Sequence, residues 1–172
     1  MTDFGNLTTA RFLPASFGST TRGIWAGGEP VGGAGSNVID YVTIASAGNA
    51  TDFGDLEAIL YGCAGVSSNT RGIVGAGWRA NSAYTNVMQY VTIASTGNTT
   101  DFGDLTSVGW LLTSTANSTR GIFASGTNDS GRKNVMDYIS IASTGNATDF
   151  GDLTSARNNL MNGMVSSAHG GL

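Results

Sequence analysis

The alternation of apolar and polar positions along the chain is typical of short β-strands. In residues 37–46, one face of an extended segment carries Val38 and Val42, and the other face carries Ile39 and Tyr41. Apolar side chains on both faces are expected of a strand that is covered on both sides. The pattern therefore predicts a strand at 37–46 that lies between two neighbouring layers.

This strand belongs to a block that occurs three times. Residues 37–56 return as 86–105 and 134–153, and fourteen of the twenty positions are identical in all three blocks. The tripeptide Asp-Phe-Gly near the end of each block also occurs at the N-terminus, which gives spacings of 49, 49 and 48 residues. A fixed period of this length indicates a repeat protein in which each unit packs against its neighbours.

Each repeat is expected to contain four short strands. In the first repeat they cover residues 12–19, 23–28, 37–46 and 51–56. A Gly-Asn turn joins the third strand to the fourth, and both residues tolerate a positive φ. Leucine, glutamate and lysine are scarce, whereas threonine, serine, valine and 26 glycines are abundant. Because this composition disfavours helices, we expect an all-β fold with almost no helix.

The order of features within a repeat resembles the kelch repeat, the four-stranded blade of one class of β-propeller. The matching features are a small apolar run with Ile24, the pair Gly27-Gly28, a variable loop and Tyr41. Phe53 and its counterparts take the place of the tryptophan that follows the tyrosine in kelch repeats. The resemblance implies a kelch-like β-propeller in a single domain, residues 1–172, with complete repeats at about 8–56, 57–105 and 106–153.

The two ends of the chain match incomplete repeats. Residues 1–7 match a fourth strand, and residues 154–172 supply a first strand and part of a second. A propeller must join its ends or leave sheet edges exposed to unwanted pairing. We therefore expect both ends to pair in one composite blade, either within one chain or between chains, and we favour the homo-oligomer.

An arginine and an aspartate recur in step along the chain, with each arginine nineteen residues after the aspartate of the preceding Asp-Phe-Gly. The motif Thr-Arg-Gly-Ile supplies the arginines, and Asp-Phe-Gly supplies the aspartates. The residues are Arg22, Arg71, Arg120, Asp52, Asp101 and Asp149. Because a guanidinium can hold a carboxylate through two parallel hydrogen bonds, we expect structural ion pairs within or between blades.

The connections between the second and third strands differ in every repeat. They cover residues 29–36, 78–85 and 127–133, and equivalent loops of a propeller emerge on one side. Aromatic and polar side chains there could stack on a sugar ring and hydrogen-bond its hydroxyls. The candidates are Trp78, Arg79, Tyr84, Asn128, Asp129, Arg132 and Lys133. The alternative is that these loops vary because nothing constrains them.

Charge and composition exclude several classes of function. The net charge is −4 with no basic stripe, so we expect no nucleic-acid partner. No run of about 18 apolar residues occurs, so we expect no membrane insertion. Cys63 and His169 are the single cysteine and histidine, which leaves no cluster for a metal or for a nucleophile and its base. We therefore expect no cofactor and no enzymatic activity.

The near-identical blocks also resemble repeats in structural proteins of bacteriophages, notably cyanophage virion and tail-fibre proteins. This second resemblance implies synthesis in the host cytoplasm, location in the virion, and contacts with other virion proteins or with copies of the same chain. We expect a non-enzymatic virion structural or tail-fibre-associated module, with a host-surface glycan as its ligand where it serves attachment. The alternative is a free carbohydrate-binding lectin.

Overall fold

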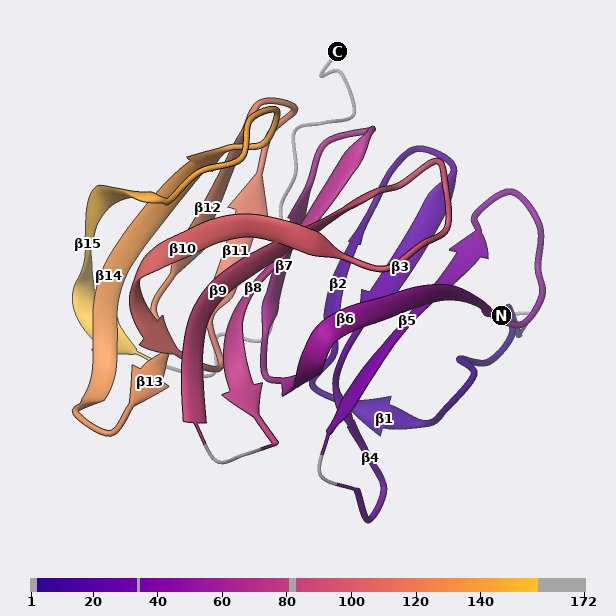
Figure 1. The fold of residues 1–172 in the computed structure, drawn as a ribbon, viewed down its shortest axis with the longest axis horizontal. Helices are drawn as coiled ribbons and strands as arrows, with labels where there is room; N and C mark the ends of the chain where they lie inside the picture. Colours follow the sequence, from indigo (N-terminus) through magenta and orange to yellow (C-terminus); the bar gives the residue numbers. More distant parts are fainter. Residues whose placement is uncertain (1–2, 34, 81–82, 158–172) are drawn as a thin grey trace.

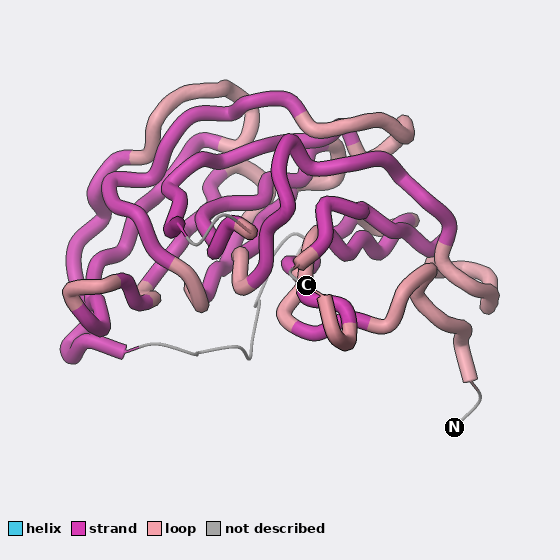
Figure 2. Tube along the Cα trace, turned by 60° about the horizontal axis from the view of Figure 1, so that its bottom comes forward, coloured by secondary structure: helices cyan, strands magenta, loops and turns pink. Residues whose placement is uncertain are grey.

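The fold is built from β-strands alone. The computed structural model describes residues 3–33, 35–80 and 83–157, and no helix occurs in these ranges. Figure 2 shows strands joined by loops and turns throughout the described chain. The prediction of an all-β fold is therefore confirmed.

The strands fall into three units of four, each unit antiparallel throughout and paired in chain order (Figure 1). Unit 1 contains β2 (Ala15–Gly18), β3 (Arg22–Ala26), β5 (Ser36–Thr43) and β6 (Thr51–Tyr61). Unit 2 contains β7 (Ala64–Ser67), β8 (Arg71–Arg79), β9 (Ala83–Thr92) and β10 (Thr100–Gly109). Unit 3 contains β11 (Thr113–Ala116), β12 (Arg120–Ala124), β14 (Gly131–Ser140) and β15 (Thr148–Arg157). Three two-residue strands lie beside them: β1 (Arg11–Phe12), β4 (Glu29–Pro30) and β13 (Thr127–Asn128).

The fourth strand of each unit is longer than the sequence predicted. The prediction ended β6 at Leu56, but the strand continues to Tyr61. Leu60 pairs with Ser36 on β5 of its own unit. In addition, Leu60 pairs with Arg79 and Tyr61 with Trp78, both on β8 of the next unit. These two pairs join units 1 and 2 into one eight-stranded, strongly curled sheet. Residues 154–157, which the sequence assigned to a new first strand, likewise extend β15.

Successive units also meet along their first strands. The Ser67 hydroxyl on β7 donates to the Gly18 carbonyl on β2, at 2.7 Å. One unit further, the Ser114 hydroxyl on β11 donates to the Gly65 carbonyl on β7, also at 2.7 Å. The first strands of the three units therefore lie side by side, an arrangement compatible with a β-propeller.

The apolar core lies between the units. Phe53 of unit 1 packs in one cluster with Val91 and Ile93 of unit 2. Phe102 of unit 2 packs in a second cluster with Ile139 and Ile141 of unit 3. Met88 and Val91, on opposite faces of β9, are both buried, so the predicted burial of the third strand on two sides is confirmed for the middle unit.

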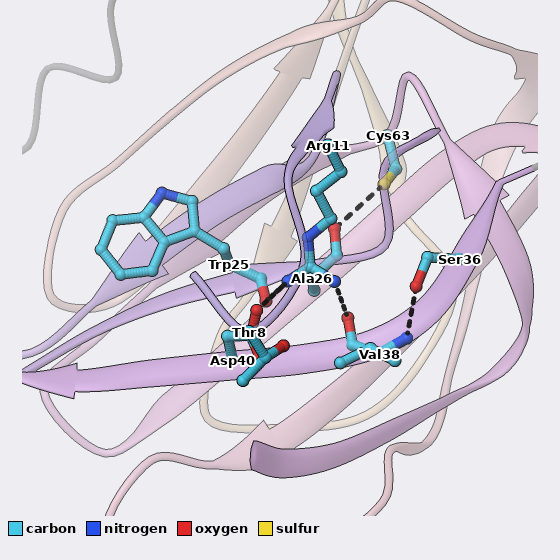
Figure 3. Close-up of polar contacts among 8 residues, drawn as sticks. All are labelled: Thr8, Arg11, Trp25, Ala26, Ser36, Val38, Asp40 and Cys63. Atoms are coloured by element: carbon cyan, nitrogen blue, oxygen red, sulfur yellow. Dashed lines mark hydrogen bonds and ion pairs between the residues drawn. The ribbon is translucent and has the colours of Figure 1, made fainter. Parts of the chain in front are cut away.

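A buried ion pair anchors the N-terminal part of the chain to unit 1 (Figure 3). Arg11 of β1 contacts Asp40 of β5 at 2.8 Å, and both side chains are fully buried. Arg11 also donates to the carbonyls of Val38 and Trp25, and the Thr8 hydroxyl donates to Asp40 at 2.6 Å. Burial lowers the pKa of Arg11, and the Asp40 carboxylate opposes this shift. The pair is therefore held by several hydrogen bonds that offset part of its desolvation cost.

Cys63 lies in the same region as a free, buried thiol. Burial raises its pKa to about 11. Because the thiolate is the reactive form, we expect the folded protein to resist modification by a disulfide reagent at pH 8, and the unfolded protein to react fully. The measurement is the rate of thionitrobenzoate release with and without urea. Rapid reaction of the folded protein would show that the region around Cys63 opens in solution.

Residues 4–6 lie against the turn between β5 and β6 of unit 1. The Gly48 amide donates to the Phe4 carbonyl at 2.7 Å, and the Ala50 amide donates to the Asn6 carbonyl at 2.8 Å. The expected composite blade with residues 154–172 falls mainly on residues 158–172, which lie outside the described part of the chain, as does His169.

Candidate functional site: an aromatic cluster on the loop face

The three variable connections lie on one side of the molecule. In Figure 1, β4, the joined ends of β8 and β9, and β13 all lie along the bottom of the view. We call this side the loop face, and it comprises the described residues of the ranges 29–36, 78–85 and 127–133. The predicted binding residues on these connections therefore lie on one surface.

Four aromatic rings gather at the loop face, and we call them the aromatic cluster: Tyr61, Trp78, Tyr84 and Trp110. Trp78 and Tyr84 are partners across β8 and β9, with ring centroids 4.6 Å apart and planes at 88°. Trp110 lies 5.7 Å from Trp78 and 6.0 Å from Tyr61. All four side chains are half-buried. Edge-to-face packing fixes the orientation of each ring while part of its surface stays open.

Two members of the cluster were missed by the sequence reasoning. Tyr61 ends β6, and Trp110 lies between β10 and β11, where it bridges to Thr127. The sequence placed both residues in predicted first strands, at 59–67 and 108–114, whose sequences are irregular. The sequence did contain a signal for these residues, namely an aromatic side chain at one repeated position. Phe12, Tyr61 and Trp110 each lie five residues after the leucine that follows Asp-Phe-Gly. An aromatic residue at one repeated position, outside the core pattern, marks a surface shared by all repeats.

Tyr84 also connects unit 2 to the loop of unit 3. Desolvation raises the pKa of Tyr84, and the charge of Asp129 and a hydrogen bond to its carboxylate raise it further. At the other end of the cluster, desolvation and the charge of Glu29 raise the pKa of Tyr61. The aromatic cluster is thus flanked by one carboxylate from the loop of unit 1 and one from the loop of unit 3.

The remaining candidates differ in how free they are to bind a ligand. Asn128 accepts a hydrogen bond from the Ser130 amide at 3.0 Å and so shapes its own turn. Lys133 donates to the Val108 carbonyl at 2.9 Å, and burial lowers its pKa. Arg132 is exposed. The Nε of Arg79 is buried and has no hydrogen-bond partner among the described residues. Arg132 is therefore the most accessible of these cations.

The structure corrects the expected pairing of the repeated arginines with the repeated aspartates. Among the described residues, the only ion pair is that of Arg11 with Asp40, so the pairs expected for Arg22, Arg71 and Arg120 with Asp52, Asp101 and Asp149 do not form. The repeated aspartates are instead exposed, and the Asp149 carboxylate accepts a hydrogen bond from the Gly151 amide at 2.9 Å. The equal spacing shows that the arginines and the aspartates recur together in sequence. It does not bring their side chains to facing sides of the strands.

Each repeated arginine lies over the repeated tyrosine of its own unit. The guanidinium carbon is 4.6 Å from the ring centroid of Tyr41, 4.5 Å from that of Tyr90 and 4.6 Å from that of Tyr138. A guanidinium over the face of an aromatic ring is attracted by the ring quadrupole. The motif Thr-Arg-Gly-Ile is therefore a packing element of every unit.

No group of three or more His, Cys, Asp or Glu side chains gathers among the described residues. No helix in those residues is long and apolar enough to cross a membrane. A comparison with models of known protein families gives no match for the chain, and a comparison with curated proteins gives none either.

Proposed function

We propose that this chain is a kelch-like β-propeller module without enzymatic activity that binds a glycan through the aromatic cluster, as part of a virion or tail fibre that attaches to a host surface. The observation that carries the proposal is the gathering of four half-buried aromatic rings on one loop face, drawn from units 1 and 2 and from the connection between units 2 and 3. The propeller assignment is supported by the side-by-side first strands of successive four-stranded units.

The chemistry of the aromatic cluster suits a sugar better than an apolar ligand. Ring faces pack against the C–H groups of a pyranose, and nearby polar groups select its hydroxyls. Asp129 supplies an acceptor beside Tyr84. The same site would serve a free lectin, which remains the alternative. Detection of the chain in purified virus particles distinguishes a virion module from a lectin that acts alone.

We expect replacement of Tyr84 by alanine to weaken glycan binding by about five- to thirtyfold, since one stacking contact is worth about 1–2 kcal/mol. Tyr84→Phe keeps the ring and removes the hydroxyl that meets Asp129, so it separates stacking from hydrogen bonding. The measurement is binding to a glycan array, followed by calorimetry with the best ligand. Ile59→Ser, which alters an exposed apolar residue outside the aromatic cluster, is the control.

Two results would contradict this proposal. Wild-type protein that binds no glycan on a broad array would leave the aromatic cluster without its proposed ligand. Equal binding by wild type and Tyr84→Ala would place the ligand elsewhere. The melting temperature of Tyr84→Phe should stay close to that of the wild type, because its ring still packs against Trp78.

A further inference from the structure

The same backbone contact joins each unit to the next. The Gly97 amide of unit 2 donates to the Phe53 carbonyl of unit 1 at 2.7 Å, and the Gly145 amide of unit 3 donates to the Phe102 carbonyl of unit 2 at 2.7 Å. Beside each bond, an asparagine side chain of the later unit accepts from the earlier strand: Asn98 from the Asp55 amide, and Asn146 from the Asp104 amide. The repeated Asp-Phe-Gly-Asp and Gly-Asn segments are thus two halves of one interface.

Glycine is required where these halves touch. Gly54 and Gly103 have φ values of +145° and +136°, and a Cβ on either would overlap the carbonyl oxygen of Gly97 or Gly145. The repeated arginine crosses the same interface. Arg22 donates to the Ile93 carbonyl at 2.7 Å, and Arg71 donates to the Ile141 carbonyl at 3.0 Å.

Unit 3 carries the first half of this interface without the second, and we call this surface the rear face: Phe150, Gly151, Asp152 and Arg120. Phe150 is 48% exposed, whereas Phe53 and Phe102 are 2% exposed. A Cβ on Gly151, at φ +126°, would meet nothing within 4 Å. Arg120 lies over Tyr138 like its counterparts and, among the described residues, donates to no isoleucine carbonyl.

Unit 1 carries the second half, and we call this surface the front face: Ile44, Gly48, Asn49 and Ala50. Ile44 is 50% exposed, whereas its equivalents Ile93 and Ile141 are 1% exposed. Ile44 of the front face is therefore exposed, whereas a preceding unit covers the equivalent isoleucines of units 2 and 3.

The N-terminal residues occupy part of the front face but cover it poorly. Phe4, Gly5 and Asn6 repeat the contacts of a fourth strand, because the Asn6 amide donates to the Asn49 side chain and a Cβ on Gly5 would overlap the Gly48 carbonyl. Phe4 nevertheless stays 43% exposed, and Ile44 remains open beside it. This segment satisfies the hydrogen bonds of the front face without burying its apolar surface.

We propose that the rear face of one chain docks on the front face of a second copy and displaces that copy's Asp3–Asn6 segment. The second copy fits because its Ile44–Ala50 segment matches the sequence that already covers Phe53 and Phe102 in units 2 and 3. Docking buries Phe150 of one chain against Ile44 of the other. It also lets Arg120 donate a hydrogen bond to the Ile44 carbonyl, and it replaces each hydrogen bond of the displaced segment by an equivalent one. The net gain is apolar burial, which favours association.

This contact is heterologous, because two different surfaces meet. Repetition of such a contact gives a closed ring where the rotation closes and an open filament where it does not. The N-terminal segment acts as a competitor that keeps the front face satisfied until another copy arrives. The inference does not depend on what the aromatic cluster binds.

The test is sedimentation velocity of the full chain and three glycine-to-alanine variants over a wide range of concentration. Wild type is expected to associate as concentration rises. Gly151→Ala places a Cβ against the incoming Gly48 carbonyl and should weaken association at least about a hundredfold. Gly5→Ala disrupts the competing segment and should strengthen it about tenfold. Gly131→Ala, at φ +105° with nothing within 4 Å of its Cβ, adds the same strain away from both faces and should leave association unchanged.

Three outcomes would overturn the proposal. If the wild type and Gly5→Ala both stay monomeric at every concentration, another segment of the chain covers the rear face or the two faces do not meet. Association that survives Gly151→Ala would place the contact on other surfaces. Equal loss in Gly151→Ala and Gly131→Ala would show that backbone strain alone is responsible. Circular dichroism of each variant confirms that the β-fold is retained.

Discussion

Replacement of Asp40 by asparagine is expected to lower the free energy of unfolding by about 3–5 kcal/mol, the usual cost of leaving one charge of a buried pair without its partner. Asp40 faces Arg11 at 2.8 Å with both side chains fully buried. The amide of asparagine could still accept from Thr8, but it would leave the guanidinium charge uncompensated. Urea denaturation, followed by tryptophan fluorescence, measures the change.

Asp137, the equivalent residue of unit 3, provides the matched control. Its carboxylate accepts hydrogen bonds from the Thr106 amide at 2.9 Å and the Thr106 hydroxyl at 2.7 Å, without an arginine. Gln89 fills the same position in unit 2, where its amide oxygen accepts from Thr99 and Glu57. Asp137→Asn should therefore cost only about 1 kcal/mol. Equal losses for Asp40→Asn and Asp137→Asn would show that Arg11 adds nothing beyond the hydrogen bonds.

Gly103→Ala is expected to lower the free energy of unfolding by about 2–5 kcal/mol. About 1–2 kcal/mol comes from placing an L-residue at a positive φ, here +136°. A further 1–3 kcal/mol, roughly the cost of overpacking, comes from the overlap of the new Cβ with the Gly145 carbonyl. Thermal and urea unfolding of the variant measure the sum.

Gly151→Ala separates these two contributions. It has a similar φ of +126°, but its Cβ would meet nothing within 4 Å, so only the backbone strain should remain. The measurement must be made at a concentration where the chain is monomeric, since association would restore the overlap. If both variants lose the same free energy, the stacking of unit 2 on unit 3 does not depend on the close approach at Gly103.

Much of the architecture could be predicted because the repeat is nearly exact. Identical blocks at a constant spacing must form the same local structure, and the alternation within one block indicated its strands. The ends of the fourth strands could not be predicted in this way. At the end of β6, Leu60 and Tyr61 meet Arg79 and Trp78 of the next unit, and no pattern within a single strand reports a partner on another unit.

The candidate site was predicted in part. Trp78 and Tyr84 were found because they lie in a connection whose sequence differs between otherwise similar repeats, although the structure places them on the ends of β8 and β9. Tyr61 and Trp110 were missed because the sequence placed each in a predicted first strand, and only folding brings them to the loop face. The repeated arginines were assigned the wrong partners, since sequence spacing says which groups recur together but not which side of a strand they share.

The amino-acid sequence by itself determined the strand class, the number of similar blocks and the position of the turns, because these depend on local periodicity and on residues that tolerate particular backbone angles. The tertiary structure alone decided which copies of a repeated residue are buried. Ile44, Ile93 and Ile141 occupy the same position in the same block, yet the first is 50% exposed and the other two are 1% exposed. The difference arises because a preceding unit covers only the second and third blocks, and burial depends on neighbours rather than on local sequence.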